Sequence, residues 1–223
     1  MILILLSWIV ILLFFIPTGI FLKSILKIET NNLSIITFLG MFWQSIFLCI
    51  CSFFTNIGIE IFITNAILVS FISYNRKKEI KNSLIEFKNF FKINSIFSKI
   101  NLLITLISCL FVSSKSPFLI DNESCYIQTI KWINEFGFVK GLANLHIFLE
   151  QTSPFHVLQA GFNFSFLTNN LNDLNGLILV ILCLYFIKVQ IDYFEKKYFI
   201  KPQLRTESLK DGFYSKNLKP KND

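Results

Sequence analysis

Both histidines and several carboxylates of this sequence fall in one polar segment, residues 119–175. Asp121 and Glu123 are carboxylates that could accept a proton from an attacking hydroxyl group, which is the role of a general base. The same carboxylates could join a histidine in binding a metal ion, but His146 and His156 belong to different predicted helices. One helix therefore cannot present both histidines to a metal, and we predict no metal site and no cofactor.

An amphipathic helix is expected to begin at these carboxylates. Asp121 or Asn122 can cap its N-terminus. Its apolar periodicity continues to about Phe136, and Gly137 is typical of a helix end. A polar residue at a helix start is more often a cap than a catalyst. Two roles, helix cap and general base, therefore remain open for Asp121.

Two shorter helices are expected further along the segment. Leu142, Leu145 and Leu149 have the spacing of one apolar helix face. Ser153 followed by Pro154 is typical of a helix start, with serine as the cap and proline at the first helical position. The third helix would present four apolar side chains on one face, namely Phe155, Leu158, Phe162 and Phe166. The pattern favours a helical platform at a membrane surface over an extended loop.

The aromatic and histidine side chains of this platform could serve either structure or binding. Tyr126 and Trp132 suit the aromatic belt at a membrane interface, and the alternative for Trp132 is stacking on a sugar ring. We expect His146 to hydrogen-bond within the platform and His156 to be exposed.

Most of the remaining sequence is predicted to lie in a bilayer. Of its 223 residues, 53% are hydrophobic and only 16% are charged, whereas soluble domains have about 25% charged residues. Runs long enough to cross ~30 Å of hydrocarbon as helices cover residues 1–22, 33–54, 57–74, 100–118 and 176–194. The first run could instead be a signal peptide, but it lacks a basic start and a cleavage site. We predict an all-α polytopic membrane protein with about five spans and a helical extracytoplasmic loop between the fourth and fifth.

Basic residues are concentrated in the segment 75–99 and in the tail 195–223. In membrane proteins such grouping marks the cytoplasmic side, and it gives no reason to expect nucleic-acid binding. The prediction is an inner-membrane protein with its N-terminus outside, its C-terminus in the cytoplasm and the loop 119–175 outside. Segment 75–99 is either a helix lying on anionic headgroups or a solvated linker.

Glu60 is a carboxylate inside the third apolar run. Such a residue is a functional candidate by default, because a charge is costly in lipid. The alternative is that Glu60, near the tip of the hairpin between the second and third runs, extends to the interface. We favour the interfacial interpretation.

The polar segment also carries a family resemblance. The sequence from Asp121 to Tyr126, continued by Lys131-Trp132 and by the stretch 141–146, resembles a loop of uncharacterised multi-spanning bacterial envelope proteins. Those proteins in turn resemble GT-C glycosyltransferases, in which a catalytic Asp or Glu follows a transmembrane helix in the first large extracytoplasmic loop. The resemblance implies a polyprenyl-phosphate-linked sugar as donor and Asp121 as the catalytic residue, with Glu123 as second candidate. It implies four substrate-binding candidates, Tyr126, Trp132, Asn144 and His146.

The chain departs from the GT-C class in having fewer spans, so it is either a short member or a truncated one. The alternative to an enzyme is a non-catalytic membrane subunit or a small transporter, in which Glu60, Asn65 and the polar loop would serve assembly or a solute path. The predicted partners are the lipid bilayer and a lipid-linked sugar, with no nucleic acid, and protein partners stay unknown from the sequence.

Overall fold

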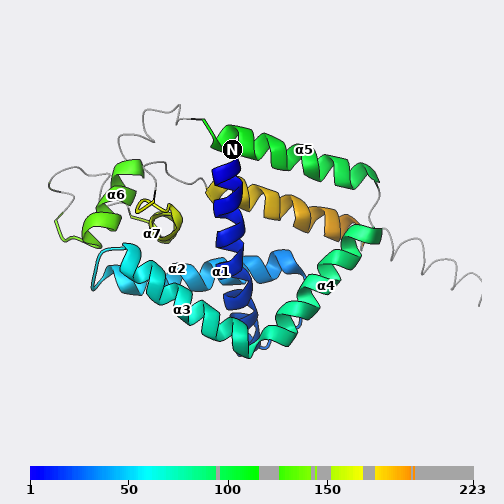
Figure 1. The fold of residues 1–223 in the computed structure, drawn as a ribbon, viewed down its shortest axis with the longest axis horizontal. Coiled ribbons are helices and arrows are strands. Elements are labelled where there is room, and N and C mark those ends of the chain that lie inside the picture. The colour runs from blue at the N-terminus through cyan, green and yellow to red at the C-terminus, as the bar shows by residue number, and fades with distance from the viewer. Residues whose placement is uncertain are drawn as a thin grey trace, which may run out of the picture. The chain divides into compact units, whose positions relative to one another are not determined.

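The computed structural model describes residues 1–93, 96–115, 126–141, 144, 152–167, 174–191 and 193. This part of the chain is helical and contains no β-strand, which confirms the predicted all-α class. The helices, seven of them labelled in Figure 1, are α1 (Ile2–Leu26), α2 (Leu33–Ser52), α3 (Ile59–Asn75), α4 (Lys77–Ile93), α5 (Ile96–Ser113), α6 (Ile127–Phe136), α7 (Pro154–Phe162) and the helix Leu174–Ile191. The chain divides into two units, Met1–Leu184 and Tyr185–Asp223, and every contact discussed below lies within the first unit.

Four of these helices are long and apolar enough to cross a membrane: α1, α2, α5 and Leu174–Ile191. They overlap the first, second, fourth and fifth runs predicted from hydropathy. α3 is also apolar but has only 17 residues, which at ~1.5 Å per residue is about 26 Å and lies at the short end of spanning helices. The protein is therefore a helical protein with four candidate membrane spans, and a fifth span at α3 stays a prediction.

α1 and α2 share the most extensive contact between two helices of this unit. A Cβ atom placed on Gly19 would lie 2.9 Å from the backbone nitrogen of Gly40, and one on Gly40 would lie 2.8 Å from the Cα atom of Phe15. Neither position has room for a side chain. The two helices therefore cross with their backbones in direct contact, as small residues allow in membrane proteins.

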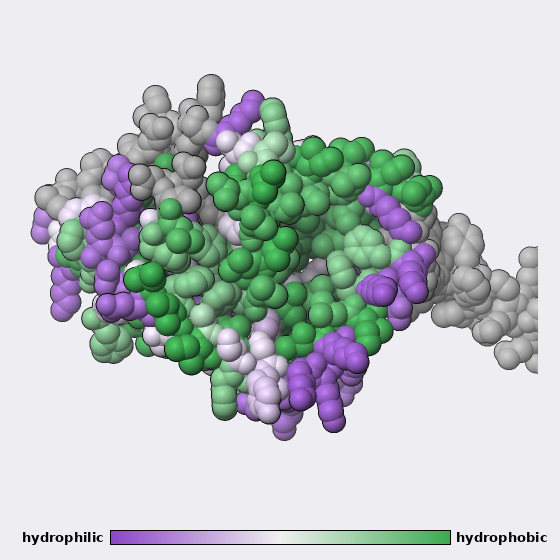
Figure 2. Space-filling model, in the orientation of Figure 1, coloured by the Kyte–Doolittle hydropathy of each residue, from purple (hydrophilic) through white to green (hydrophobic). Residues whose placement is uncertain are grey.

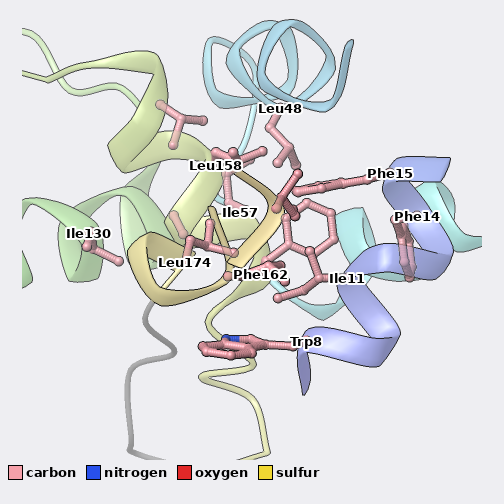
Figure 3. Packing of buried hydrophobic residues seen from close by; sticks show 14 of the residues in the cluster. Trp8, Ile11, Phe14, Phe15, Leu48, Ile57, Ile130, Leu158, Phe162 and Leu174 are labelled. Atoms are coloured by element: carbon pink, nitrogen blue, oxygen red, sulfur yellow. The ribbon is translucent and has the colours of Figure 1, made fainter. Parts of the chain in front are cut away.

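An aromatic cluster on α1 receives α7. The Phe162 ring is fully buried and meets Phe14 and Phe15 edge to face, with ring centroids 5.4 and 5.3 Å apart (Figure 3). Beside it, Gly161 lies against Leu48 of α2, where an added Cβ would come within 3.0 Å of a leucine methyl. α7 therefore packs into the apolar core between α1 and α2 rather than resting on an outer surface.

The N-terminal part of α1 packs against the beginning of the helix Leu174–Ile191. Trp8 is buried, and a Cβ on Gly176 would lie 2.8 Å from its ring and 2.6 Å from the Ser113 hydroxyl at the end of α5. Three segments far apart in the sequence thus meet at Gly176. The absence of a side chain there allows the helix to start beside the indole.

Candidate functional site

The residues predicted to form the site are only partly within the described structure. Asp121, Glu123 and His146 lie outside the described residues, and so does most of the second predicted helix. Tyr126, Trp132 and Asn144 are described. The geometry of the site follows from the positions of these three residues and from the contacts that hold α6 and α7.

Tyr126 lies immediately before α6 and its ring contacts His156 of α7, with centroids 5.3 Å apart. His156 belongs to a capping box: the Ser153 hydroxyl accepts from the His156 N–H, and His156 Nδ1 accepts from the Ser153 N–H at 3.2 Å. The serine cap and first-turn proline predicted for this helix are confirmed. The expectation that His156 would be exposed is wrong, because the capping box and the contact with Tyr126 leave it half-buried. Burial lowers the pKa of this imidazole.

Trp132 and Asn144 do not join Tyr126 in one described binding surface. Trp132 is half-buried and packs on Phe136, one turn further along α6, with ring centroids 5.0 Å apart. Six residues separate it from Tyr126, which at roughly 100° per residue places the two side chains about 120° apart around the helix. Asn144 is exposed, and its backbone N–H donates to the Gly141 carbonyl. Tyr126 and Trp132 therefore point to different sides of α6.

The end of α6 lies against the hairpin that joins α2 and α3. Gly137 ends the helix, as predicted, with φ of +70°. A Cβ at this position would lie 2.6 Å from the carbonyl oxygen of Thr55 and 2.8 Å from that of Ser52. The next residue, Phe138, donates its N–H to the same Ser52 carbonyl at 2.8 Å. Glycine therefore meets two requirements of this position: the backbone has a positive φ, and the hairpin carbonyls leave no room for a Cβ atom.

Asn134 is the central residue of this junction, although no pattern in the sequence distinguishes it. Its Nδ2 donates to the carbonyl of Ile57 in the hairpin at 2.6 Å and to that of Ala160 in α7 at 2.8 Å. Its Oδ1 accepts from Asn163 Nδ2 at 2.6 Å, and Asn163 is 3% exposed. We call these four residues, Asn134, Ile57, Ala160 and Asn163, the Asn134 clamp.

Further hydrogen bonds reinforce the clamp on the hairpin side. The Ile57 N–H donates to the Ile133 carbonyl at 3.1 Å, and Asn56 Nδ2 donates to the Asn134 carbonyl at 3.2 Å. Every one of these groups is an amide, so the clamp does not titrate and cannot itself move a proton. It fixes two helices of the polar segment to the membrane hairpin, and any acid–base chemistry must come from other residues.

No group of three or more His, Cys, Asp or Glu residues within the described ranges could hold a metal ion. Glu60 is exposed in the first turn of α3, where its negative charge interacts favourably with the helix N-terminus. Its interfacial position stays a prediction. Deeper in the structure, Asn65 of α3 donates to Gln44 of α2 at 2.8 Å, and both side chains are buried. The side-chain nitrogen Nε2 of Gln44 and the side-chain oxygen Oδ1 of Asn65 have no hydrogen-bond partner.

Comparison with known protein families gives one match. A family described as a domain of unknown function (DUF8201) matches residues 1–206. The chain belongs to this family. No curated protein and no solved structure matches it. Because the match runs from α1 past the helix Leu174–Ile191, the DUF8201 unit contains both the candidate spans and the platform helices α6 and α7.

Proposed function

We propose that this protein is a multi-pass inner-membrane enzyme of the cell envelope, which transfers a sugar from a polyprenyl-phosphate-linked donor to an acceptor outside the membrane. The observation that carries the proposal is the Asn134 clamp. A transferase of this kind must hold a water-facing acid beside a lipid-borne substrate, and α6, which directly follows the candidate acids in sequence, is held against the α2–α3 hairpin.

In this proposal Asp121 is the general base that takes the proton of the acceptor hydroxyl while the lipid phosphate leaves. Glu123 is the second candidate for that role. The donor and acceptor would be contacted by Tyr126, Trp132, Asn144 and His146. Because Tyr126 and Trp132 point to different sides of α6, the two would contact different parts of the substrates, or Trp132 would remain in the interfacial belt.

The proposed orientation has its support in the grouping of charge. Lys23 near the end of α1 is linked through Asn31 to Glu86 of α4, and Arg76, between α3 and α4, donates to Ser24 of α1. These contacts bring Lys23 and Arg76 close to α4, which carries further lysines. A basic cluster of this kind is typical of the cytoplasmic side. The hairpin tip, α6 and α7 then belong to the outer side, where lipid-linked sugars are used.

The test compares Asp121→Asn with Asp121→Ala in the intact protein. Asn caps a helix about as well as Asp but cannot accept a proton, so Asp121→Asn should leave the amount of folded protein unchanged and lower glycan output by roughly 10²–10⁴-fold. Asp121→Ala should lower both the amount of folded protein and the glycan output. Glu135→Gln, at an exposed position of α6, is the control for loss of a carboxylate. Wild-type glycan output from well-expressed Asp121→Asn protein contradicts the proposed role.

A second candidate function, a membrane subunit or small transporter, is favoured by the buried Gln44–Asn65 pair. Two of its polar atoms lack partners, and such atoms inside a helical bundle are costly unless a partner helix or a solute satisfies them. Under this alternative, Asn65→Leu abolishes function while Asp121→Asn does not. The opposite pattern supports the transferase.

A further inference from the structure

Helix α4 places most of its charges on two faces, with Lys78 between them. At roughly 100° per residue, Lys77, Lys81, Lys88 and Lys92 fall within an arc of about 60°. Glu79 and Glu86 lie on the opposite face, about 160° away by the same geometry. All four lysines are exposed, and hydrophilic residues gather over α4 in Figure 2. We call these four residues the lysine face.

The two acids of α4 are engaged with the rest of the protein. Glu79 forms an ion pair with Arg76 at 2.7 Å, and Arg76 also donates to the Ser24 hydroxyl of α1 at 3.1 Å. Glu86 accepts from Asn31 at 2.7 Å, and the other end of that amide accepts from Lys23 at 2.9 Å. Within the described ranges no carboxylate pairs with a lysine of the lysine face. The Lys77 ammonium lies over the Tyr74 ring, 5.3 Å from its centroid, and the charges of the other three lysines are left for a partner from outside.

A shallow, open groove runs along the lysine face. It has a volume of about 480 Å³ and is lined by Ser73, Lys77, Ile80, Lys81, Leu84, Ile85 and Lys88. Two of its apolar residues are exposed, since Leu84 and Ile85 each have 46% of their surface accessible. Lysines in the middle with aliphatic side chains on both flanks match a ligand that has an anionic group next to a hydrocarbon part.

We propose that this groove binds an anionic phospholipid, with its phosphate on Lys81 and Lys88 and the upper part of an acyl chain against Leu84 and Ile85. The position of α4 favours a lipid over a soluble anion, because a single residue, Arg76, separates it from the apolar helix α3. A nucleic acid would use the lysines but would leave the exposed aliphatic side chains in water. This site is independent of the proposed glycosyl transfer.

The test uses the purified full-length chain in zwitterionic detergent and a phosphatidylglycerol with a fluorescent acyl tail, followed by anisotropy. Each surface lysine contributes about 1 kcal/mol to binding of anionic lipid, so Lys81→Gln/Lys88→Gln should weaken binding roughly 30-fold. Leu84→Asn should also weaken it. The matched control is Lys131→Gln/Lys140→Gln, which removes the same charge from exposed positions outside α4 and should leave binding unchanged.

Unlabelled phosphatidylglycerol should displace the probe, whereas phosphatidylcholine and inorganic phosphate should not. Far-UV circular dichroism and thermal unfolding verify that each variant is folded. Equal weakening by the control pair would overturn the proposal, since it would mean attraction by net charge alone. Displacement by phosphate as effectively as by phosphatidylglycerol, or by a short DNA oligonucleotide at lower concentration, would also overturn it.

Discussion

Asn134 and Asn31 each join parts of the chain that are distant in sequence, yet their surroundings differ. Asn134 is half-buried and bonds two backbone carbonyls and the buried amide of Asn163. Asn31 is exposed and bonds the charged ends of Lys23 and Glu86, which are long side chains in contact with water. The residue type is the same at both sites, and the Asn134 side chain makes three hydrogen bonds where the Asn31 side chain makes two.

The difference lies in what replaces the bonds when they break. Water can solvate Lys23 and Glu86 at once, so the Asn31 link contributes little to stability. The carbonyls of Ile57 and Ala160 lie in packed backbone and would be left without a donor, which is the larger penalty. The α6–α7 region should therefore be held rigidly, whereas α4 should be held loosely and remain adaptable to lipid.

The largest effect is expected from Asn134→Ala. The substitution leaves two carbonyls and the Asn163 amide unsatisfied, and each such group costs about 1–3 kcal/mol, so the expected total is at least about 3 kcal/mol. Unfolding in mixed detergent measures this loss of stability, and proteolysis measures the opening of the segment around α6 and α7. Glu135→Ala, an exposed neighbour, is the control. A loss below about 1 kcal/mol would show that water replaces the clamp and that the two asparagines do not differ.

Next in size is the substitution Gly137→Ala. The backbone at this position, with φ +70° and ψ −148°, is almost restricted to glycine, and the added methyl would collide with the Thr55 and Ser52 carbonyls. We expect a loss of about 2–3 kcal/mol in the same unfolding assay. Gly141→Ala is the matched control, because Gly141 also has positive φ but meets only the Asn144 side chain, at 3.5 Å. Equal losses at both positions would mean that backbone strain acts alone and that the hairpin contact contributes nothing.

A smaller effect is expected from pH on α7. Because burial lowers the pKa of His156, the folded state binds fewer protons than the unfolded state between that lowered value and about 6.5. The stabilisation is present above about pH 6.5 and is lost as pH falls through the folded pKa. The protection factors of the α7 amides against hydrogen exchange should therefore fall at acid pH, since protonated Nδ1 cannot accept from Ser153.

The control for this pH effect is His156→Gln. Glutamine retains the capping box without titrating in this range. The protection factors of the α7 amides in this variant should therefore not fall at acid pH. Identical pH profiles for the wild type and His156→Gln would exclude His156 as the titrating group.

The smallest effect is expected from Asn31→Ala. It removes exposed hydrogen bonds to Lys23 and Glu86, which are worth about 0.2–1 kcal/mol and weaken as salt is added. The unfolding assay should register a change near its limit at low salt and none at high salt. A loss as large as that of Asn134→Ala, unaffected by salt, would refute the contrast between the two regions.

Much of the helical architecture follows from local signals in the sequence. Apolar runs mark the four candidate spans, Gly137 ends α6, and Ser153 with Pro154 starts α7, because each signal acts on neighbouring residues. The third predicted helix was expected to show Phe166 on the face of Phe162, but α7 ends at Phe162 and Phe166 lies exposed beyond it. Periodicity alone does not locate an end that Asn163 creates through tertiary contacts.

The site was less accessible to such reasoning. The partners of Asn134 come from positions far away along the chain, and nothing in the sequence near Asn134 distinguishes it from other asparagines. His156 was assigned to the surface because its contact with Tyr126 depends on how α6 and α7 meet. The roles of Asp121 and Glu123 rest on resemblance and position alone, and stay predictions.

The glycine crossing of α1 and α2 has a consequence for biosynthesis. These two helices are joined by a short loop and need only each other to bring Gly19 against Gly40, so they can pair as soon as both have left the ribosome. The surface that later receives Phe162 is then complete long before α7 is translated. Until α7 arrives, lipid chains can cover Phe14 and Phe15 at little cost, because hydrocarbon is as apolar as the missing phenylalanine. The order of synthesis thus matches an order of assembly in which the membrane itself protects the unfinished core.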